Sequence, residues 1–105
     1  MPQKNNIPAL SYRIVSQSWI ARIAAWKLGA ARVAIVLGSR IYLCNVTKAE
    51  FLQNEAWLRH ELCHVAQFKR YGFLPFIARY LWQSLRHGYY NNKYEVEARA
   101  AEEVC

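Results

Sequence analysis

Apolar residues recur every three to four positions over most of the chain, and this spacing predicts helices. The segments that show it run from about 16 to 28, 55 to 71, 74 to 87 and 93 to 103. Ser16 or Ser18 can cap the first segment, while Asn54 and Asn92 precede the second and the fourth. Pro75 favours a first turn in the third. Glycine, a common terminator, follows each of the first three segments.

One further helix start is visible between the first two segments. Thr47 and Glu50 have the spacing of a capping box, in which each side chain accepts a hydrogen bond from the other residue's backbone. A helix therefore begins after Thr47. The pattern leaves open whether it runs directly into the 55–71 segment or pauses at Asn54.

Two β-branched and apolar runs, Ala31–Leu37 and Arg40–Cys44, are separated only by Gly38 and Ser39. A two-residue connection with glycine first predicts a hairpin with a type II′ turn. The first run is too uniformly apolar for simple alternation. It predicts a strand that is covered on both faces or lies partly under a helix.

A stripe of Trp19, Ile23 and Trp26 marks the first predicted helix. Packing of this stripe against the core is the favoured explanation, and an amphipathic helix on a membrane surface is the alternative.

The longer apolar run from 19 to 37 is interrupted by three charged residues, Arg22, Lys27 and Arg32. Each charge near a bilayer centre costs roughly 2.5–3.5 kcal/mol on insertion scales, so a spanning helix is not expected.

Length and composition fit one small domain over residues 1–105, with 1–12 as an irregular lead-in. The chain is 54% hydrophobic and 20% charged, which is typical of globular proteins and excludes a disordered chain. Its net charge is +7, but the basic residues are scattered and no nucleic-acid-binding signature accompanies them. We therefore expect no specific nucleic-acid partner.

The cysteines give an expectation about the cellular compartment. Cys44, Cys63 and Cys105 are odd in number, widely spaced and without a CxxC pair, which argues against a disulfide framework and for a reducing environment. No signal peptide is evident in the first residues, so a cytoplasmic location is expected. The oligomeric state does not follow from these patterns.

His60, Glu61 and His64 form the pattern HExxH, which is typical of zinc-dependent hydrolases. Residues four apart lie on one face of a helix, so both imidazoles can bind one metal ion. Glu61 would stand beside the ion and take a proton from a water molecule that the metal activates. The same spacing also arises on ordinary exposed helices, so the flanking residues have to decide.

A catalytic zinc ion usually has three protein ligands, which calls for one more side chain. The candidates downstream are one imidazole and four carboxylates: His87, Glu95, Glu97, Glu102 and Glu103. A glutamate on a helix that crosses the HExxH helix is the arrangement known from thermolysin-type enzymes.

The segment His60 to Gln67, HELCHVAQ, is followed further along by Asn91 to Arg99, NNKYEVEAR. Together they resemble the gluzincins, zinc metallopeptidases whose second motif has the form ExxA[DN] or ExEA, and in particular a group of small bacterial metallopeptidase domains with an HExxHVxQ core. The resemblance covers about residues 30–103. It implies a hydrolase acting on peptide or protein substrates, with one Zn²⁺ per chain held by His60, His64 and Glu95.

The resemblance also implies a fold, which we expect to be a minimal zincin-like α+β domain. A small β-hairpin or sheet would pack on three to four helices, with HExxH on the central one. Metallopeptidases of this kind often present an edge strand to an extended substrate, and Arg40–Cys44 is the segment we expect in that place.

Two positions put the site pattern in question. Arg99 stands where many relatives carry an Asp or Asn that supports a zinc-binding histidine, so Glu102, Gln67 or a backbone carbonyl would have to replace it. Glu95 can alternatively reach back to the helix cap, and Glu97 is then the fallback ligand.

The remaining candidates surround the two motifs. An oxyanion stabiliser is expected among the side chains just before the second motif: His87, Tyr89, Tyr90 and Tyr94. Cys63 is turned away from Glu61 and is expected to be a small buried packing residue, whereas Gln67 is expected to support the site or to pack beside it.

A rival hypothesis is that the domain binds zinc but catalyses little hydrolysis. Because the chain is small, few residues remain to build a substrate cleft. On this reading the domain binds zinc for structure, recognition or a membrane-surface role, with little catalysis.

Overall fold

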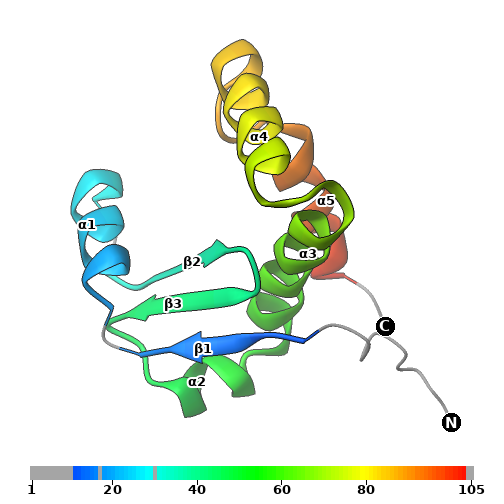
Figure 1. Cartoon of the computed structure of the whole chain (residues 1–105). Coiled ribbons are helices and arrows are strands. Elements are labelled where there is room, and N and C mark those ends of the chain that lie inside the picture. Colours follow the sequence, from blue (N-terminus) through cyan, green and yellow to red (C-terminus); the bar gives the residue numbers. More distant parts are fainter. Residues whose placement is uncertain (1–10, 17, 30, 104–105) are drawn as a thin grey trace, which may run out of the picture.

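A computed structural model describes residues 11–16, 18–29 and 31–103. Within this part the chain forms an α+β arrangement of five helices and a three-stranded sheet (Figure 1). The strands are β1 (Arg13–Val15), β2 (Val33–Leu37) and β3 (Arg40–Cys44). The helices are α1 (Trp19–Leu28), α2 (Lys48–Gln53), α3 (Glu55–Tyr71), α4 (Phe73–His87) and α5 (Lys93–Ala101).

The predicted hairpin is present. Strands β2 and β3 pair antiparallel, and the register joins Leu37 to Arg40 across a two-residue turn. Gly38 has a φ of +67°, while Ser39 is not among the positive-φ residues, and this combination of signs belongs to a type II′ turn. A glycine is needed at this position because the left-handed region strains other residues.

The sheet order is β1-β3-β2, and β1 was not predicted. This short strand pairs in parallel with β3, joining Arg13 to Arg40 and Val15 to Tyr42. The expectation that Arg40–Cys44 is an edge strand is therefore wrong, because β3 has a neighbour on each side. The edge strands are β1 and β2. Of the predicted lead-in, only Ser11 and Tyr12 lie within the described residues, and neither belongs to a helix or strand.

Helices cover both faces of the sheet. On one face Val33, Ile35 and Cys44 pack against α1, and on the other Ala34 and Val36 pack against the side of α2 and α3. Of the two alternatives left by the sequence, the structure shows a strand covered on both faces, which explains why it has no polar alternate positions. The strand begins at Val33, two residues after the expected start.

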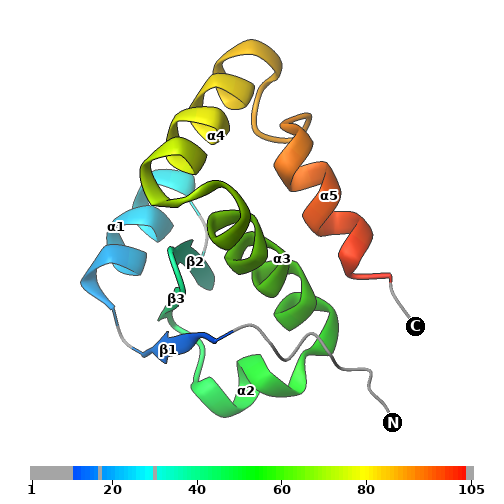
Figure 2. The same ribbon diagram turned by 45° about the vertical axis from the view of Figure 1, so that its right-hand side comes forward.

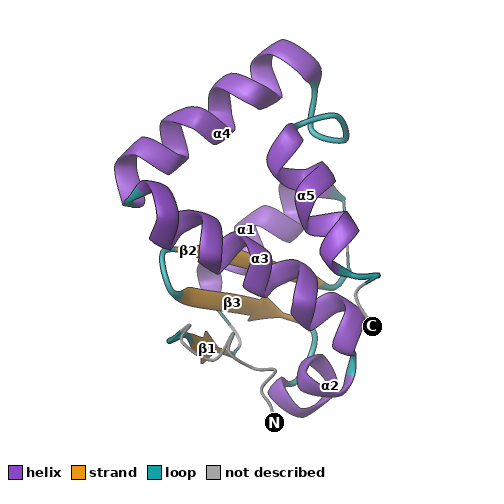
Figure 3. Ribbon diagram, turned by 90° about the vertical axis from the view of Figure 1, so that its right-hand side faces the viewer, coloured by secondary structure: helices purple, strands orange, loops and turns teal. Residues whose placement is uncertain are grey.

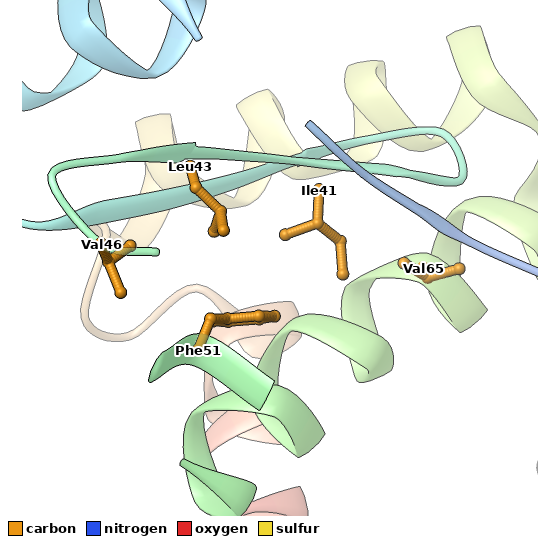
Figure 4. Close-up of a cluster of buried hydrophobic side chains, with 5 residues drawn as sticks. All are labelled: Ile41, Leu43, Val46, Phe51 and Val65. Atoms are coloured by element: carbon orange, nitrogen blue, oxygen red, sulfur yellow. The ribbon is translucent and has the colours of Figure 1, made fainter. Parts of the chain in front are cut away.

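The main core lies between the sheet and the pair α2 and α3. Figure 4 shows its five buried side chains, contributed by β3, the following loop, α2 and α3: Ile41, Leu43, Val46, Phe51 and Val65. The ring of Phe51 also packs edge-on against Trp57, with centroids 5.1 Å apart. Through Val65, the apolar strip of α3 faces this core. The opposite side of α3 is therefore free to contact other helices.

The first helix packs in the opposite sense to the prediction. Ser18 is its N-cap and Gly29 its C-cap, but Ala21 and Ala25 form the buried face, while Trp19, Ile23 and Trp26 are between 52% and 80% exposed. The expectation that the Trp19 stripe faces the core is therefore wrong. Small alanine side chains let the helix approach the sheet closely, which leaves the large residues outside.

The chain pauses at Asn54, which settles the alternative left open by the sequence. The Thr47 capping box forms, with hydrogen bonds of 3.0 Å in both directions. Asn54 ends α2 and caps α3, since its Oδ1 accepts a 3.1 Å hydrogen bond from the Trp57 amide. The separation of α2 from α3 gives five helices in the described part of the chain, against the three to four expected.

Helix α3 lies between the sheet and α5, and α4 crosses beyond its C-terminal end (Figures 2 and 3). An aromatic cluster of Phe68, Phe76 and Tyr94 joins α3, α4 and α5. Asn92 is fully buried at the corner between α4 and α5. Its Nδ2 donates to the Tyr80 carbonyl and to Ser84 Oγ, and its Oδ1 accepts from the Tyr94 amide.

The remaining boundaries are close to the expected ones. Helix α4 begins at Phe73 and is followed by Gly88, and α5 ends at Ala101, two residues before the predicted end. None of the helices in the described residues combines the length and the apolar character needed to cross a membrane.

The core assignment gives a stability prediction. Phe51 is 0% exposed and its neighbour Leu52 is 36% exposed, so Phe51→Ala should lower the free energy of unfolding by about 3–5 kcal/mol. The matched variant Leu52→Ala should lower it by less than about 1 kcal/mol. Urea unfolding followed by circular dichroism measures both, and equal losses would contradict this core.

Candidate metal centre

Helix α3 presents the two motif histidines one turn apart, on the side away from the main core. Their ring centroids are 5.1 Å apart. His64 is buried and His60 is half-buried. Helix α5 packs alongside and brings the buried carboxylate of Glu95 to the same place. Glu95 is far from the two histidines in sequence, so its approach to them depends on the packing of α5 against α3.

Glu95 lies symmetrically between the two imidazoles. Its Oε1 is 3.2 Å from His60 Nε2 and also 3.2 Å from His64 Nε2. In tetrahedral zinc sites, ligand bonds of about 2.0–2.1 Å place two ligand atoms about 3.3 Å apart. One ligand atom from each residue lies within 4.8 Å of the others, so the three fit a single ion.

Both imidazoles are held in the orientation that leaves Nε2 for a ligand. The Nδ1 of His64 donates to Gln67 Oε1 at 2.8 Å, and the Nδ1 of His60 donates to Glu102 Oε2 at 2.6 Å. The Gln67 amide cannot be turned the other way, because its Nε2 donates to Glu97 Oε1 at 2.7 Å. Such partners fix the ring and its tautomer in metal sites.

Arg99 plays no part in orienting the histidines. Its Nη2 donates to the Tyr90 carbonyl at 2.6 Å, and its guanidinium lies 3.8 Å from the centroid of the Tyr90 ring. Glu102, two turns after Glu95, takes the supporting place instead. Of the three replacements considered from the sequence, Glu102 contacts His60 and Gln67 contacts His64.

Glu61 is buried beside the histidines. The Trp57 indole N–H donates a 3.1 Å hydrogen bond to Glu61 Oε2. Burial raises the pKa of Glu61 to about 7, although the two histidines act in the opposite direction. A carboxylate with a pKa near neutrality can both accept and return a proton.

The charges around Glu95 shift the pKa values of its partners. Burial opposes protonation of His60, but Glu95, Glu61 and Glu102 outweigh it and raise its pKa to about 9. The pKa of His64 is raised for the same reasons, mainly by Glu95. Burial acts against ionisation of Glu95, yet the hydrogen bonds from the two histidines lower its pKa well below the usual range.

Two tyrosines reach the site. The Tyr80 hydroxyl of α4 donates a hydrogen bond to Glu95 Oε2. Tyr89 is 58% exposed but borders the cavity into which the site opens, and partial burial raises its pKa to about 12. Tyr89 was among the expected oxyanion stabilisers, whereas Tyr80 was missed because it lies in the middle of a helix outside either motif.

The other candidates lie elsewhere. Neither His87 nor Tyr90 borders the cavity, Tyr94 belongs to the aromatic core, and the Glu97 carboxylate holds Gln67. Cys63 is half-buried instead of buried, and burial raises the pKa of its thiol to about 11. None of these five belongs to the group of side chains that could hold the ion.

The site opens into a cavity of about 500 Å³. Residues of α3, α4, α5, α1 and β2 border it. Four consecutive β2 residues, Ala34 to Leu37, take part. Because side chains alternate between the faces of a strand, consecutive residues can all border one cavity only along the strand's free edge. The edge next to the site is therefore that of β2.

Comparisons with family models, curated proteins and solved structures found no match to this chain. The resemblance to gluzincins stays a prediction that rests on the two motifs.

Removing the partner of His60 should weaken metal binding. Glu102→Ala takes away the acceptor for His60 Nδ1, so zinc affinity should fall by roughly 10–100-fold. Glu102→Gln keeps an acceptor oxygen and should lose less. Competition with a chromogenic chelator measures both variants, and unchanged affinity in Glu102→Ala would contradict the supporting role.

Metal binding should also depend on pH. Zinc requires neutral imidazoles, and His60 with a pKa of about 9 carries a proton at neutral pH that the ion must displace. Affinity should therefore rise with pH, by about tenfold per unit for each displaced proton, and level off above pH 9. Titrations from pH 6 to 9.5, corrected for the chelator, measure the slope. A flat profile would contradict the raised pKa.

Proposed function

We propose that this protein is a zinc-dependent metallopeptidase that hydrolyses peptide bonds in peptide or protein substrates. The observation that carries the proposal is the equal 3.2 Å approach of Glu95 Oε1 to His60 Nε2 and His64 Nε2, beside the buried carboxylate of Glu61. Three ligand candidates and a general base thus meet at one cavity.

His60, His64 and Glu95 would hold the ion. Among the described residues, their ligand atoms lie close enough together to bind one ion. When bound, zinc would lower the pKa of a water molecule in its open position and polarise the scissile carbonyl. The half-buried and buried positions of these ligands keep the ion's charge in a low-dielectric environment, where it acts strongly.

Glu61 is the proposed general base and acid. It borders the cavity and has a pKa of about 7. Its carboxylate would take a proton from the attacking water and return it to the leaving amine, which balances the hydrolysis. The Trp57 indole holds one carboxylate oxygen, so the other is left to exchange the proton.

Tyr80 and Tyr89 are the proposed donors to the oxyanion. Burial and the neighbouring Glu95 raise the pKa of both hydroxyls, which keeps them protonated. A protonated hydroxyl can donate to the oxygen on which charge develops. Tyr80 would exchange its hydrogen bond to Glu95 for this one.

An extended substrate would pair with the free edge of β2. This strand borders the cavity with four consecutive residues, and main-chain hydrogen bonds to an edge strand bind peptides largely without regard to sequence. The expected role of Arg40–Cys44 thus passes to Val33–Leu37.

Two features favour catalysis over a purely structural ion. Structural zinc sites are almost always closed by four protein ligands, whereas the group here has three. The site also borders a cavity of about 500 Å³, which is within the range of small-molecule and peptide-side-chain pockets.

The test separates metal binding from turnover. Glu61→Gln should retain one zinc per chain and lose at least about 100-fold in cleavage of a quenched-fluorescent peptide library or an unfolded protein. Both His60→Ala and His64→Ala should lose zinc. Glu55→Gln, an exposed glutamate on the same helix, is the matched control and should cleave normally.

The outcomes are distinct. Wild-type protein that contains zinc but shows no cleavage would support the structural rival. Purified wild-type protein without zinc would count against both. Full activity in Glu61→Gln would remove the proposed mechanism.

A further inference from the structure

Two helices expose large apolar side chains that no described part of the chain covers. On α1 these are Trp19, Ile23 and Trp26. On α4 they are Leu81, Trp82 and Leu85, between 56% and 80% exposed. The α1 residues recur at intervals of four and three, and Leu81 and Trp82 lie four and three residues before Leu85, so each set forms a continuous strip along its helix. Large contiguous apolar surfaces on soluble proteins usually mark an interaction site.

The two strips belong to one region of the molecule. In Figure 1 both helices extend above β2, the edge strand that borders the cavity, although α1 and α3 cover opposite faces of the sheet. Both helices border the cavity of the metal centre, α1 through Ala24 and α4 through Ile77 and Leu81. The exposed tryptophans do not line the cavity. Both strips therefore lie on helices that border the cleft, and the α4 strip reaches it through Leu81.

The charged residues on both helices are basic. The sequence contains no Asp, and none of its Glu residues lies between positions 1 and 49 or between 62 and 94. Both helices fall in these stretches. Exposed Arg22 flanks the α1 strip, and exposed Arg79 and Arg86 flank the α4 strip. The Arg86 guanidinium lies 5.5 Å from the ring of Trp82.

We propose that the exposed apolar strips of α1 and α4, with their flanking arginines, dock this protein on a membrane surface containing anionic lipids. Tryptophan is favoured at the boundary between headgroups and acyl chains, and arginine pairs with the phosphate groups there. Apolar burial and attraction to anionic lipid act together in interfacial helices.

Charge argues against the other occupants. A second copy would bring two all-basic surfaces together, and the net charge of +7 on each chain adds to their repulsion. A peptide bound in the cavity would leave Trp19 and Trp26 uncovered, since they lie outside it. An anionic membrane neutralises the arginines and covers both strips.

The test is flotation of the full chain with vesicles. Wild type should bind phosphatidylcholine vesicles that contain phosphatidylglycerol, bind pure phosphatidylcholine weakly, and release as salt rises. The paired variants Trp19→Ser/Trp26→Ser and Trp82→Ser/Leu85→Ser should each lose at least about tenfold in affinity. Val96→Ser, an exposed apolar residue on α5, is the matched control and should bind normally.

The charge contribution is measured separately. Arg22→Gln and Arg86→Gln should each weaken binding to anionic vesicles by about fivefold, while Lys48→Gln on α2 should not. Brominated lipids should quench the fluorescence of wild type more than that of Trp19→Ser/Trp26→Ser. Circular dichroism and thermal unfolding identify any variant that fails to fold. Because the substituted positions are exposed, Ala can replace Ser in such a variant without loss of core packing.

Three results would overturn the proposal. One is the absence of flotation with anionic vesicles, and another is equal loss in the Val96 and Lys48 controls. The third is a concentration-dependent dimer of the wild type that the strip variants do not form, together with no binding of the wild type to vesicles. Vesicle binding needs neither zinc nor turnover, so Glu61→Gln should float like wild type, and this result is independent of the proposed peptidase activity.

Discussion

The burial of one negative charge organises the C-terminal half of this molecule. An ionised carboxylate removed from water costs several kcal/mol unless it is paired and hydrogen-bonded. Glu95 meets that requirement with two imidazoles from α3 and a hydroxyl from α4. These partners fix the positions of three helices relative to each other. The same contacts that make the buried charge tolerable also assemble the candidate metal ligands, so packing and chemistry are not separable here.

The sequence predicted those parts of the fold that depend on local signals. The Ser18, Thr47, Asn54 and Asn92 caps and the Gly38 turn are set by residues within a few positions of each other. It did not predict β1, whose three residues form a strand only because β3 lies beside them. Periodicity located the apolar stripe of α1 but did not show which face of the helix is buried. The alanine face packs against the sheet, and the stripe is exposed.

The site was predictable to the extent that its residues follow one another at helical spacing. His60, Glu61 and His64 share a helix, and Glu95 followed from the resemblance of the second motif. Glu102 was among the replacements considered for the acidic residue missing at Arg99, and two turns separate it from Glu95, which places both on the same side of the C-terminal segment. Tyr80 carried no such signal. Its approach to Glu95 depends on the corner that Asn92 holds between α4 and α5.

The placement of the ligands has a consequence for the folding equilibrium. His60 and Glu95 are 35 residues apart in sequence, and the residues between them belong to α3, α4, the start of α5 and their connections. An ion held by both would act as a cross-link across that segment and remove conformational entropy from the unfolded chain, as a disulfide does. The sheet and α1 lie outside the closed loop. Metal occupancy would therefore raise the free energy of local opening chiefly in the segment from α3 to α5, which contacts the sheet through α3 and α4.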